Sequence, residues 1–214
     1  MRALIIGDTG GIGEALRDRL ERGGHEVLGL SRARDGFDIS EEAKIEAVIS
    51  GLDGTFDMVV IASGILGTPE KSLATLKADE MMRLFAVNAM GPALVMKHVT
   101  RLLPKDSRAH LAVLSARVGS IGDNYLGGWY SYRASKAALN QLVRTASIEL
   151  RRKFPELVVA ALHPGTVATA FTSNYTMDKV SPDEAAERLL SVLQGLTPEQ
   201  SGGFWDYSGK SVEW

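Results

Sequence analysis

The sequence predicts a single α/β domain of the doubly wound Rossmann type, and three observations lead to that prediction. Short apolar runs alternate with amphipathic segments along the 214 residues, which is typical of a parallel sheet covered by helices. A glycine-rich string directly follows the first apolar run, as in dinucleotide-binding turns. The length suffices for one large core but not comfortably for two. We therefore expect residues 1–214 to form one domain.

The first half of the chain begins with an apolar run, residues 3–6, that is expected to form the opening strand. In the next segment Ile12, Leu16 and Leu20 share one helical face, and Gly23-Gly24 ends the helix. Residues 58–62 are apolar throughout, as in a parallel strand buried on both faces. We expect strands at 3–6, 27–30 and 58–62 and helices at 12–22, 41–49 and 79–103, the last bent near Gly91-Pro92.

The second half continues the alternation. Predominantly apolar runs predict two further buried strands, and Pro155 ends the long helix expected between them. Ser181, directly before Pro182, fits the N-cap of a last helix. We expect strands at 110–114, 157–162 and 203–207 and helices at 135–154 and 182–193.

Composition excludes several classes of protein. The formal net charge is −2 and the pI is about 6.1, so no electrostatic feature indicates nucleic acid. The absence of cysteine excludes disulfides and thiolate sites and fits a reducing, cytoplasmic compartment. No run reaches the ~18 apolar residues of a membrane span, and the N-terminal run lacks the features of a signal peptide. The four histidines show no metal-ligand spacing, so no metal is expected.

The glycine string runs Gly7-Asp-Thr-Gly-Gly-Ile-Gly13, between the first expected strand and the first expected helix. A turn here must be tight and must let the backbone approach a ligand, and both tasks favour a missing side chain. Free N–H groups at the start of the helix then bind an anion, typically a pyrophosphate. The spacing G-x-x-x-G-x-G differs from the commoner G-x-G-x-x-G, and such turns also occur without a ligand. The strand before it and the helix after it favour dinucleotide binding.

Cofactor choice is set at the end of the second strand, where an acidic residue holds the ribose of NAD and a basic one suits the 2′-phosphate of NADP. This chain has Ser31-Arg32-Ala-Arg34 there. A hydroxyl and a guanidinium can hold a phosphate. We therefore expect NADP(H) to be preferred over NAD(H). The alternative is that the two arginines are solvated loop residues.

Tyr132 and Lys136 are four residues apart, so on a helix they share a face. A lysine ammonium beside a phenol stabilises the phenolate and lowers its pKa, so that the tyrosine can act as an acid or base near neutral pH. The pair is unspecific alone, since Tyr175 and Lys179 repeat it. We interpret the second copy as coincidence or part of a substrate loop.

With these motifs in place, the chain resembles the short-chain dehydrogenase/reductase family over nearly its whole length, and in particular a small carbonyl-reductase-like branch. The resemblance implies a catalytic set of Tyr132, Lys136, Asn88 and Ser115. It also implies a cofactor site that uses the same tyrosine, lysine and asparagine. The remaining cofactor residues would be Gly7, Thr9, Gly11, Ile12, Gly13, Ser31, Arg32, Asp38, Ile39, Ala62, Ser63, Gly64, Pro164, Gly165, Val167 and Thr169.

Two departures from the family pattern leave questions open. The family usually has Ser-Ser-x-x-Gly after the fourth of these strands, whereas this chain has Ser115-Ala116-Arg-Val-Gly119. Either Ser115 or Ser120 can then orient the substrate, and we favour Ser115. Residues 31–36 are also too few to hold a helix, although adjacent parallel strands normally need a crossover of about a dozen residues. We therefore expect that helix to be missing, the strand near Phe37 to be vestigial and the adenine side to be exposed.

These features predict an NADPH-dependent reductase or dehydrogenase of a small carbonyl or alcohol compound, with Tyr132 as acid/base. The alternative is a non-catalytic nucleotide-binding regulator of the same fold. A methyltransferase shares the glycine-rich turn, but it requires an acid at the second strand's end. Partners are expected to be a small-molecule substrate and further copies of the chain, as a homodimer or homotetramer, with no nucleic acid and no membrane.

Overall fold

A computed structural model describes residues 1–173, 176 and 178–214. Six parallel strands form one sheet in the order β2-β1-β3-β4-β5-β6, so the order reverses between β1 and β3. The expected doubly wound fold is therefore confirmed. The strands are β1 (Arg2–Ile6), β2 (Glu26–Leu30), β3 (Met58–Ile61), β4 (Ala109–Leu114), β5 (Leu157–His163) and β6 (Gly203–Asp206).

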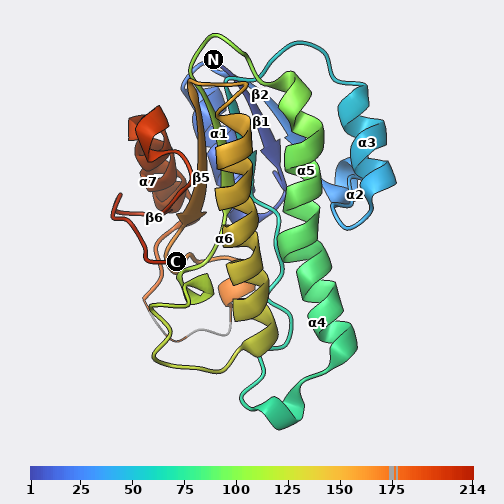
Figure 1. The fold of residues 1–214 in the computed structure, drawn as a ribbon, viewed down its shortest axis with the longest axis vertical. Helices are drawn as coiled ribbons and strands as arrows, with labels where there is room; N and C mark the ends of the chain where they lie inside the picture. The colour runs from blue at the N-terminus through green and yellow to red at the C-terminus, as the bar shows by residue number, and fades with distance from the viewer. Residues whose placement is uncertain (174–175, 177) are drawn as a thin grey trace.

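Helices cover both faces of the sheet. On one face lie α1 (Gly11–Arg22) and α7 (Pro182–Gly195), which pack against each other. The other face carries α3 (Glu42–Ser50), α4 (Ala78–Phe85), α5 (Gly91–Val99) and α6 (Tyr130–Leu150). In Figure 1, α4 and α5 follow one another as a continuous helical stretch beside α6, and α7 lies on the other side of the sheet. The short helical segments are α2 (Arg32–Asp35), the π-helical Ala86–Met90, and the 3-10 turns Leu73–Thr75, Thr100–Leu102, Arg117–Gly119, Ala170–Thr172 and Pro198–Gln200.

Two apolar clusters hold these layers together. One joins the sheet to α3, α5 and α6 and includes Phe56, Val143 and Phe204. The other joins the sheet to α1 and α7 and includes Leu16 and Leu189. Strands β3, β4 and most of β5 are buried along their length, which explains their unbroken apolar runs. Within the described residues, none of the helices has the length and apolar character of a membrane span.

The segment after β2 corrects one expectation. Residues Arg32–Asp35 form one helical turn, α2, whereas the sequence predicts no helix in this segment. The turn is possible because the Ser31 hydroxyl accepts from the Arg34 N–H and the Asp35 carboxylate accepts from the Ser31 N–H. It is far too short to be a crossover helix, and Phe37 belongs to no strand. The sheet therefore ends at β2.

Helix α6 starts at Tyr130 rather than at the expected residue 135 and ends at Leu150 rather than 154. Trp129, at the N-cap, has the left-handed φ of 55° and turns the chain sharply into the helix. The first turn of α6 consequently contains Tyr132. Both Tyr132 and Lys136 therefore belong to one regular helix, which fixes their relative orientation.

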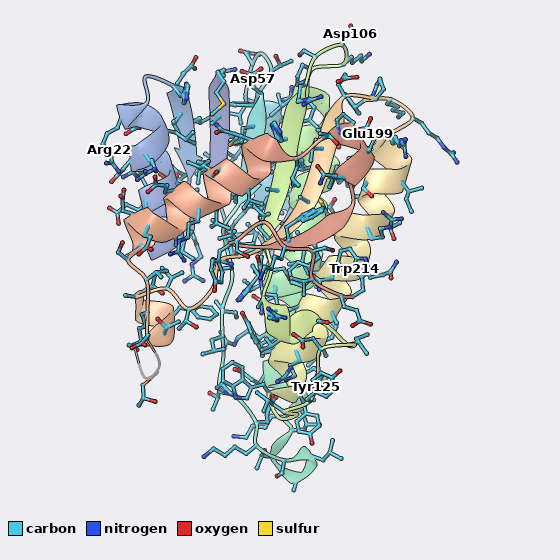
Figure 2. The ribbon with its side chains drawn as sticks, turned by 90° about the vertical axis from the view of Figure 1, so that its left-hand side faces the viewer. Arg22, Asp57, Asp106, Tyr125, Glu199 and Trp214 are labelled. Atoms are coloured by element: carbon cyan, nitrogen blue, oxygen red, sulfur yellow. The ribbon has the colours of Figure 1, made fainter. Side chains whose placement is uncertain are left out.

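The carboxyl ends of the strands face one end of the molecule. Figure 2 shows Asp57, directly before β3, at the upper end and Tyr125, on the loop after β4, at the lower end. The glycine string, the serines after β2 and β4 and the Pro164-Gly165 segment all follow these strand ends. Ligands of open α/β sheets bind at this edge.

Candidate active site

A cavity of about 660 Å³ lies at the carboxyl edge of the sheet. It extends from the glycine turn to the loop before α6 and is lined mostly by apolar and backbone atoms, as small-molecule sites are. Its lining includes most of the expected site residues: Gly11, Ile12, Gly13, Ala62, Ser63, Gly64, Ser115, Tyr132, Lys136, Pro164, Gly165, Val167 and Thr169.

The glycine turn is as tight as its sequence requires. Gly7 has a φ of +88°, and a Cβ on Gly13 would lie 2.1 Å from the Gly7 carbonyl oxygen. The residue at the N-cap of α1 is Gly10, which has no side chain to cap the first N–H groups. Those N–H groups and the positive end of the helix dipole suit a phosphate. The turn therefore fits the pyrophosphate of a dinucleotide.

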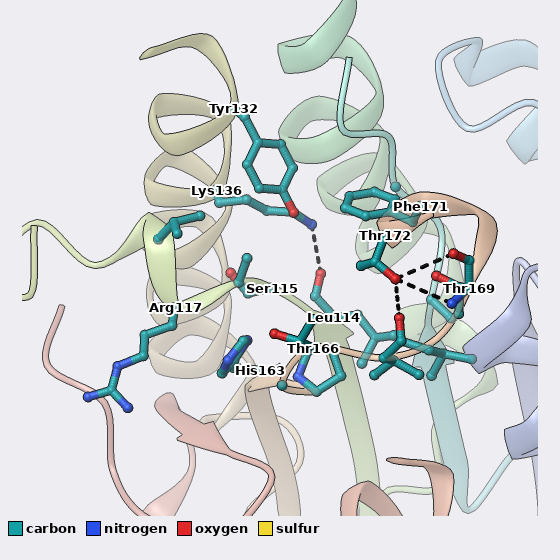
Figure 3. Close-up of a pocket in the computed structure, with 18 of the residues that line it drawn as sticks. Leu114, Ser115, Arg117, Tyr132, Lys136, His163, Thr166, Thr169, Phe171 and Thr172 are labelled. Carbon is teal, nitrogen blue, oxygen red and sulfur yellow. Dashed lines mark hydrogen bonds between the residues drawn. The ribbon is translucent and has the colours of Figure 1, made fainter. Parts of the chain in front are cut away.

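Two other segments approach this turn closely. A Cβ on Gly11 would lie 2.6 Å from Thr169 Cγ2, and one on Gly7 would lie 2.7 Å from Ser63 Oγ. Thr169 in turn begins a short helical turn that it shares with Thr172, as Figure 3 shows. Larger residues at these glycines would push the three segments apart. Thr9 is exposed and does not line the cavity.

Lys136 lies deep in the cavity wall, 4% exposed. Its Nζ donates to the Leu114 carbonyl oxygen at the end of β4, at 2.8 Å, as Figure 3 shows. Burial disfavours the charged form and lowers the pKa of Lys136 to about 8. At neutral pH the Lys136 amine is therefore mostly protonated, and it loses its proton as the pH rises through about 8.

Tyr132 is 5% exposed and projects from α6 into the same cavity (Figure 3). Its ring packs between Trp129 and Phe171, at centroid distances of 6.1 and 6.0 Å. Trp129 precedes α6 and Phe171 follows β5, so three segments fix the phenol. Tyr175 lies outside the described residues, as do Asn174 and Met177.

Asn88 is fully buried in the π-helical segment between α4 and α5. Its amide accepts from the Ile65 N–H and donates to the Ile65 carbonyl, both at 2.9 Å, and also donates to Ser135 Oγ at 3.1 Å. A Cβ on Gly64 would come within 3.4 Å of Asn88 Oδ1 and 3.6 Å of Lys136 Nζ. Gly64 therefore lies close to both the buried asparagine and the buried lysine.

The two candidate serines are separated by the fold. Ser115 lines the cavity, and its hydroxyl donates to Asn140 Oδ1 at 2.6 Å. Ser120 is 2% exposed and accepts from the Asp123 N–H within its own loop, away from the cavity lining. Of the two hydroxyls, that of Ser115 lies beside the tyrosine and the lysine.

The four residues expected on the adenosine side lie outside the cavity lining. Ser31 is buried, whereas the Arg32 side chain is 79% exposed and lies 4.0 Å from Asp38. Asp38 accepts from the N–H and hydroxyl of Ser40, and Ile39 is 5% exposed within the core. Ser31, Arg32, Asp38 and Ile39 are all absent from the cavity lining. The expected adenine side therefore lies outside that cavity.

His163, at the end of β5, lines the cavity opposite α6 (Figure 3). Its Nδ1 is buried without a hydrogen-bond partner among the described residues. Burial lowers the pKa of His163 to about 4, so the ring is neutral near pH 7. The described residues contain no cluster of side chains able to hold a metal ion.

Three contributors escaped the sequence analysis. Asn140 is one turn beyond Lys136, so the spacing 132–136–140 could have indicated it. Glu70 is 6% exposed and accepts from the N–H and hydroxyl of Ser131, in the first turn of α6. The Leu114 carbonyl is a backbone group. No sequence signal marks the last two, because their partners are distant in the chain.

The sequence is similar to those of a known family and of several known proteins. The short chain dehydrogenase family matches residues 35–180, which leaves the glycine string outside the matched region. The chain is 30% identical to the 1-hydroxy-2-glutathionyl-2-methyl-3-butene dehydrogenase of Rhodococcus sp. (strain AD45), over 99% of this chain and 98% of that protein. It is 36% identical to the C-signal protein of Myxococcus xanthus, over 75% of this chain and 94% of that one.

The fold itself recurs in solved structures. The NADPH-bound carbonyl reductase from chicken fatty liver superposes with a TM-score of 0.87 at 24% identity, covering 100% of this chain and 98% of that one. An NADP-bound short-chain dehydrogenase/reductase from Burkholderia multivorans gives a TM-score of 0.84 at 24% identity, covering 100% and 99%.

Proposed function

The chain belongs to the short-chain dehydrogenase family of oxidoreductases, and from this premise we propose that it is an NADPH-dependent carbonyl reductase or alcohol dehydrogenase acting on a small organic substrate. The observation that carries the proposal is the convergence of Tyr132, Lys136 and Ser115 on one cavity that also reaches the glycine turn. The cavity thus brings the phenol of Tyr132, the amine of Lys136 and the hydroxyl of Ser115 together beside a turn suited to phosphate.

In the proposed reaction, Tyr132 donates its phenolic proton to the substrate's carbonyl oxygen, or accepts the proton of an alcohol in reverse. Bound NADPH supplies the hydride that reaches the carbonyl carbon. The ammonium of Lys136 stabilises the phenolate that Tyr132 leaves behind. Packing between Trp129 and Phe171 holds the phenol in place.

Ser115 is proposed to donate a hydrogen bond to the same substrate oxygen. It can do so by turning its hydroxyl from Asn140, which lies at 2.6 Å in this structure. Donors aimed at an oxygen that gains charge lower the barrier most. The buried Asn88 is proposed to hold the local arrangement of Ile65 and Ser135 beside Lys136.

The glycine turn would hold the pyrophosphate of the cofactor, and Ser63, Gly64, Gly165, Val167 and Thr169, which line the same cavity, would hold the rest of it. Arg32 supports a preference for NADPH, because its exposed guanidinium stands at the end of β2. The NADPH-bound chicken enzyme of the same fold agrees with that preference.

Assembly as a homodimer or homotetramer is part of the proposal. Apolar side chains remain exposed on the helices of one face, among them Met82, Met90 and Ile148. Light scattering would give the subunit number.

A regulatory role without catalysis is the second candidate, and the 36% identity to C-signal favours it. A pure regulator has no use for a buried lysine placed beside a tyrosine. The two candidates predict different behaviour in the same assay.

The test is a titration of the purified protein with NADPH and NADH, followed by nicotinamide fluorescence, and then NADPH oxidation with a panel of aldehydes and ketones. We expect both binding and carbonyl-dependent oxidation. Binding without turnover of any compound would favour the regulator, and no binding of either dinucleotide would contradict both candidates.

A further inference from the structure

The glycine turn contains an acid, Asp8, whose side chain is fully buried. A carboxylate in a phosphate-binding turn would repel the ligand if it faced the cavity. Instead it points under β2, where Gly29 leaves the space: a Cβ on Gly29 would lie 2.0 Å from Asp8 Oδ2. The acid and the glycine therefore fit each other.

Two arginines neutralise this buried charge. Arg34 pairs with both carboxylate oxygens of Asp8, from Nη1 at 2.9 Å and from Nη2 at 3.2 Å, and Arg17 Nη1 lies 3.1 Å from Oδ2. Such forked pairs are the strong form of a charge-assisted hydrogen bond. Arg34 therefore reaches back from α2 and is held beneath the cofactor turn.

A second carboxylate, that of Asp35, also pairs with Arg34. Asp35 accepts from Arg34 Nε at 3.1 Å and lies 2.9 Å from Nη2. It also accepts from the N–H of Ser31 at 2.8 Å and from its hydroxyl at 3.3 Å. Arg34 Nη2 further donates to the Gly29 carbonyl. The two carboxylates raise the pKa of the Arg34 guanidinium above its ordinary value.

The sequence after β2 suggests two arginines available for a phosphate, but the carboxylates of Asp8 and Asp35 already neutralise one of them, Arg34. Both Ser31 donors and both edges of the Arg34 fork are occupied by carboxylates. The Arg34 side chain is 47% exposed but pairs with Asp8 and Asp35, whereas the Arg32 side chain is 79% exposed and has only Asp38 beside it, at 4.0 Å. A 2′-phosphate arriving at this place would meet one available arginine instead of two.

We propose that Asp8 and Asp35 are specificity-determining residues that withhold Arg34 and Ser31 from the cofactor's 2′-phosphate. The inference rests on the proposed function. Discrimination then depends on Arg32, so the wild-type protein prefers NADPH only modestly and also accepts NADH. Removing one carboxylate releases a guanidinium for the phosphate and strengthens the preference.

The experiment measures the dissociation constants of NADPH and NADH by fluorescence titration of the intact protein. Asp35→Asn should lower the Kd for NADPH by about tenfold, as expected for one charge-assisted hydrogen bond, and should leave the Kd for NADH within about twofold. Asp8→Asn should act in the same direction. Because Asp8 is buried, its variant is first checked by thermal melting, and the partly exposed Asp35 decides the question if Asp8→Asn does not fold.

Two further variants isolate the cause. Asp183→Asn removes the same charge from the surface of α7, where the carboxylate pairs with Arg19 and Arg22, and should leave the NADPH-to-NADH ratio unchanged. Arg34→Lys keeps a cation for Asp8 but lacks the fork, so Asp35→Asn combined with Arg34→Lys should lose the gain.

An unchanged ratio in Asp35→Asn would overturn the inference. So would a gain that survives Arg34→Lys, or a loss of NADPH affinity of about tenfold or more from Arg34→Lys alone, since Arg34 would then already bind the phosphate. If wild type binds neither dinucleotide, the proposed function fails instead, which separates the two failures.

Discussion

The nicotinamide and adenosine ends of the proposed cofactor site are built from different interactions. At the nicotinamide end, Lys136 and Ser115 are buried and bond to a backbone carbonyl and an amide rather than to charges. At the adenosine end, the buried carboxylate of Asp8 pairs with Arg17 and Arg34, whose side chains are partly exposed. A helix and the strand ends thus position the proposed catalytic side chains, whereas we propose that cofactor choice depends on which carboxylates pair with Arg34.

The largest expected effect concerns the nicotinamide end alone. Tyr132→Phe removes the proposed proton donor, so kcat/KM should fall by about a thousandfold, within the range of general acid–base catalysis. The Kd for NADPH should stay within about twofold, because the phenol is not needed for phosphate binding. Steady-state kinetics and fluorescence titration measure the two quantities.

Tyr130→Phe, two residues earlier on α6, is the matched control and should retain wild-type kinetics. If Tyr132→Phe kept the wild-type rate, Tyr132 would not be the proton donor, and the proposed catalytic role of the nicotinamide end would be wrong.

The glycine turn lies between the two ends, and its tightness can be tested directly. Gly13→Ala places a Cβ 2.1 Å from the Gly7 carbonyl oxygen. Both dinucleotides should then bind more than about tenfold less tightly, since the turn must open. In Gly51→Ala, at the end of α3 and outside the cavity lining, the nearest atom is 3.6 Å away, and affinity should change little. If the two substitutions raised Kd equally, the glycine turn would not be the phosphate-binding site.

The pH dependence of the reaction should report the burial of Lys136. Its pKa of about 8 lies below the ordinary value of 10.5, so the ammonium loses its proton as the pH rises through 8. Carbonyl reduction should therefore fall about tenfold for each pH unit well above 8. A pH–rate profile at saturating NADPH checks this, with the Kd for NADPH measured across the same range.

A flat alkaline limb up to pH ~10 would mean that Lys136 keeps its proton or that its charge does not matter. The adenosine-end arginines stay charged throughout that range, so NADPH binding should vary less than the rate.

The smallest effect is expected at the serine. Ser115→Ala removes one hydrogen bond to the substrate oxygen and should lower kcat by about five- to tenfold. Ser120→Ala should leave kcat unchanged, because its hydroxyl bonds to the Asp123 N–H outside the cavity lining. The reverse outcome would move the oxygen-orienting role to Ser120.

The fold was largely predictable from the sequence, because periodicity and strand burial are local properties. The apolar runs at β3 and β5 and the capped start of α7 at Ser181 lie where the sequence indicates them. The start of α6 was missed by five residues, since it depends on the left-handed Trp129 and on Glu70, which is distant in the chain. The single turn α2 was missed because Ser31 and Asp35 stabilise it through side chains.

The sequence by itself determined the glycine turn and the shared helical face of Tyr132 and Lys136, since both follow from spacing along one element. Only the tertiary structure decided that Ser115 and not Ser120 lines the cavity, and that Ile39 lies in the core. It alone also decided which acids neutralise Arg34. Ion pairs join residues as far apart as Asp8 and Arg34, and their partners depend on distances that exist only once the strands lie side by side.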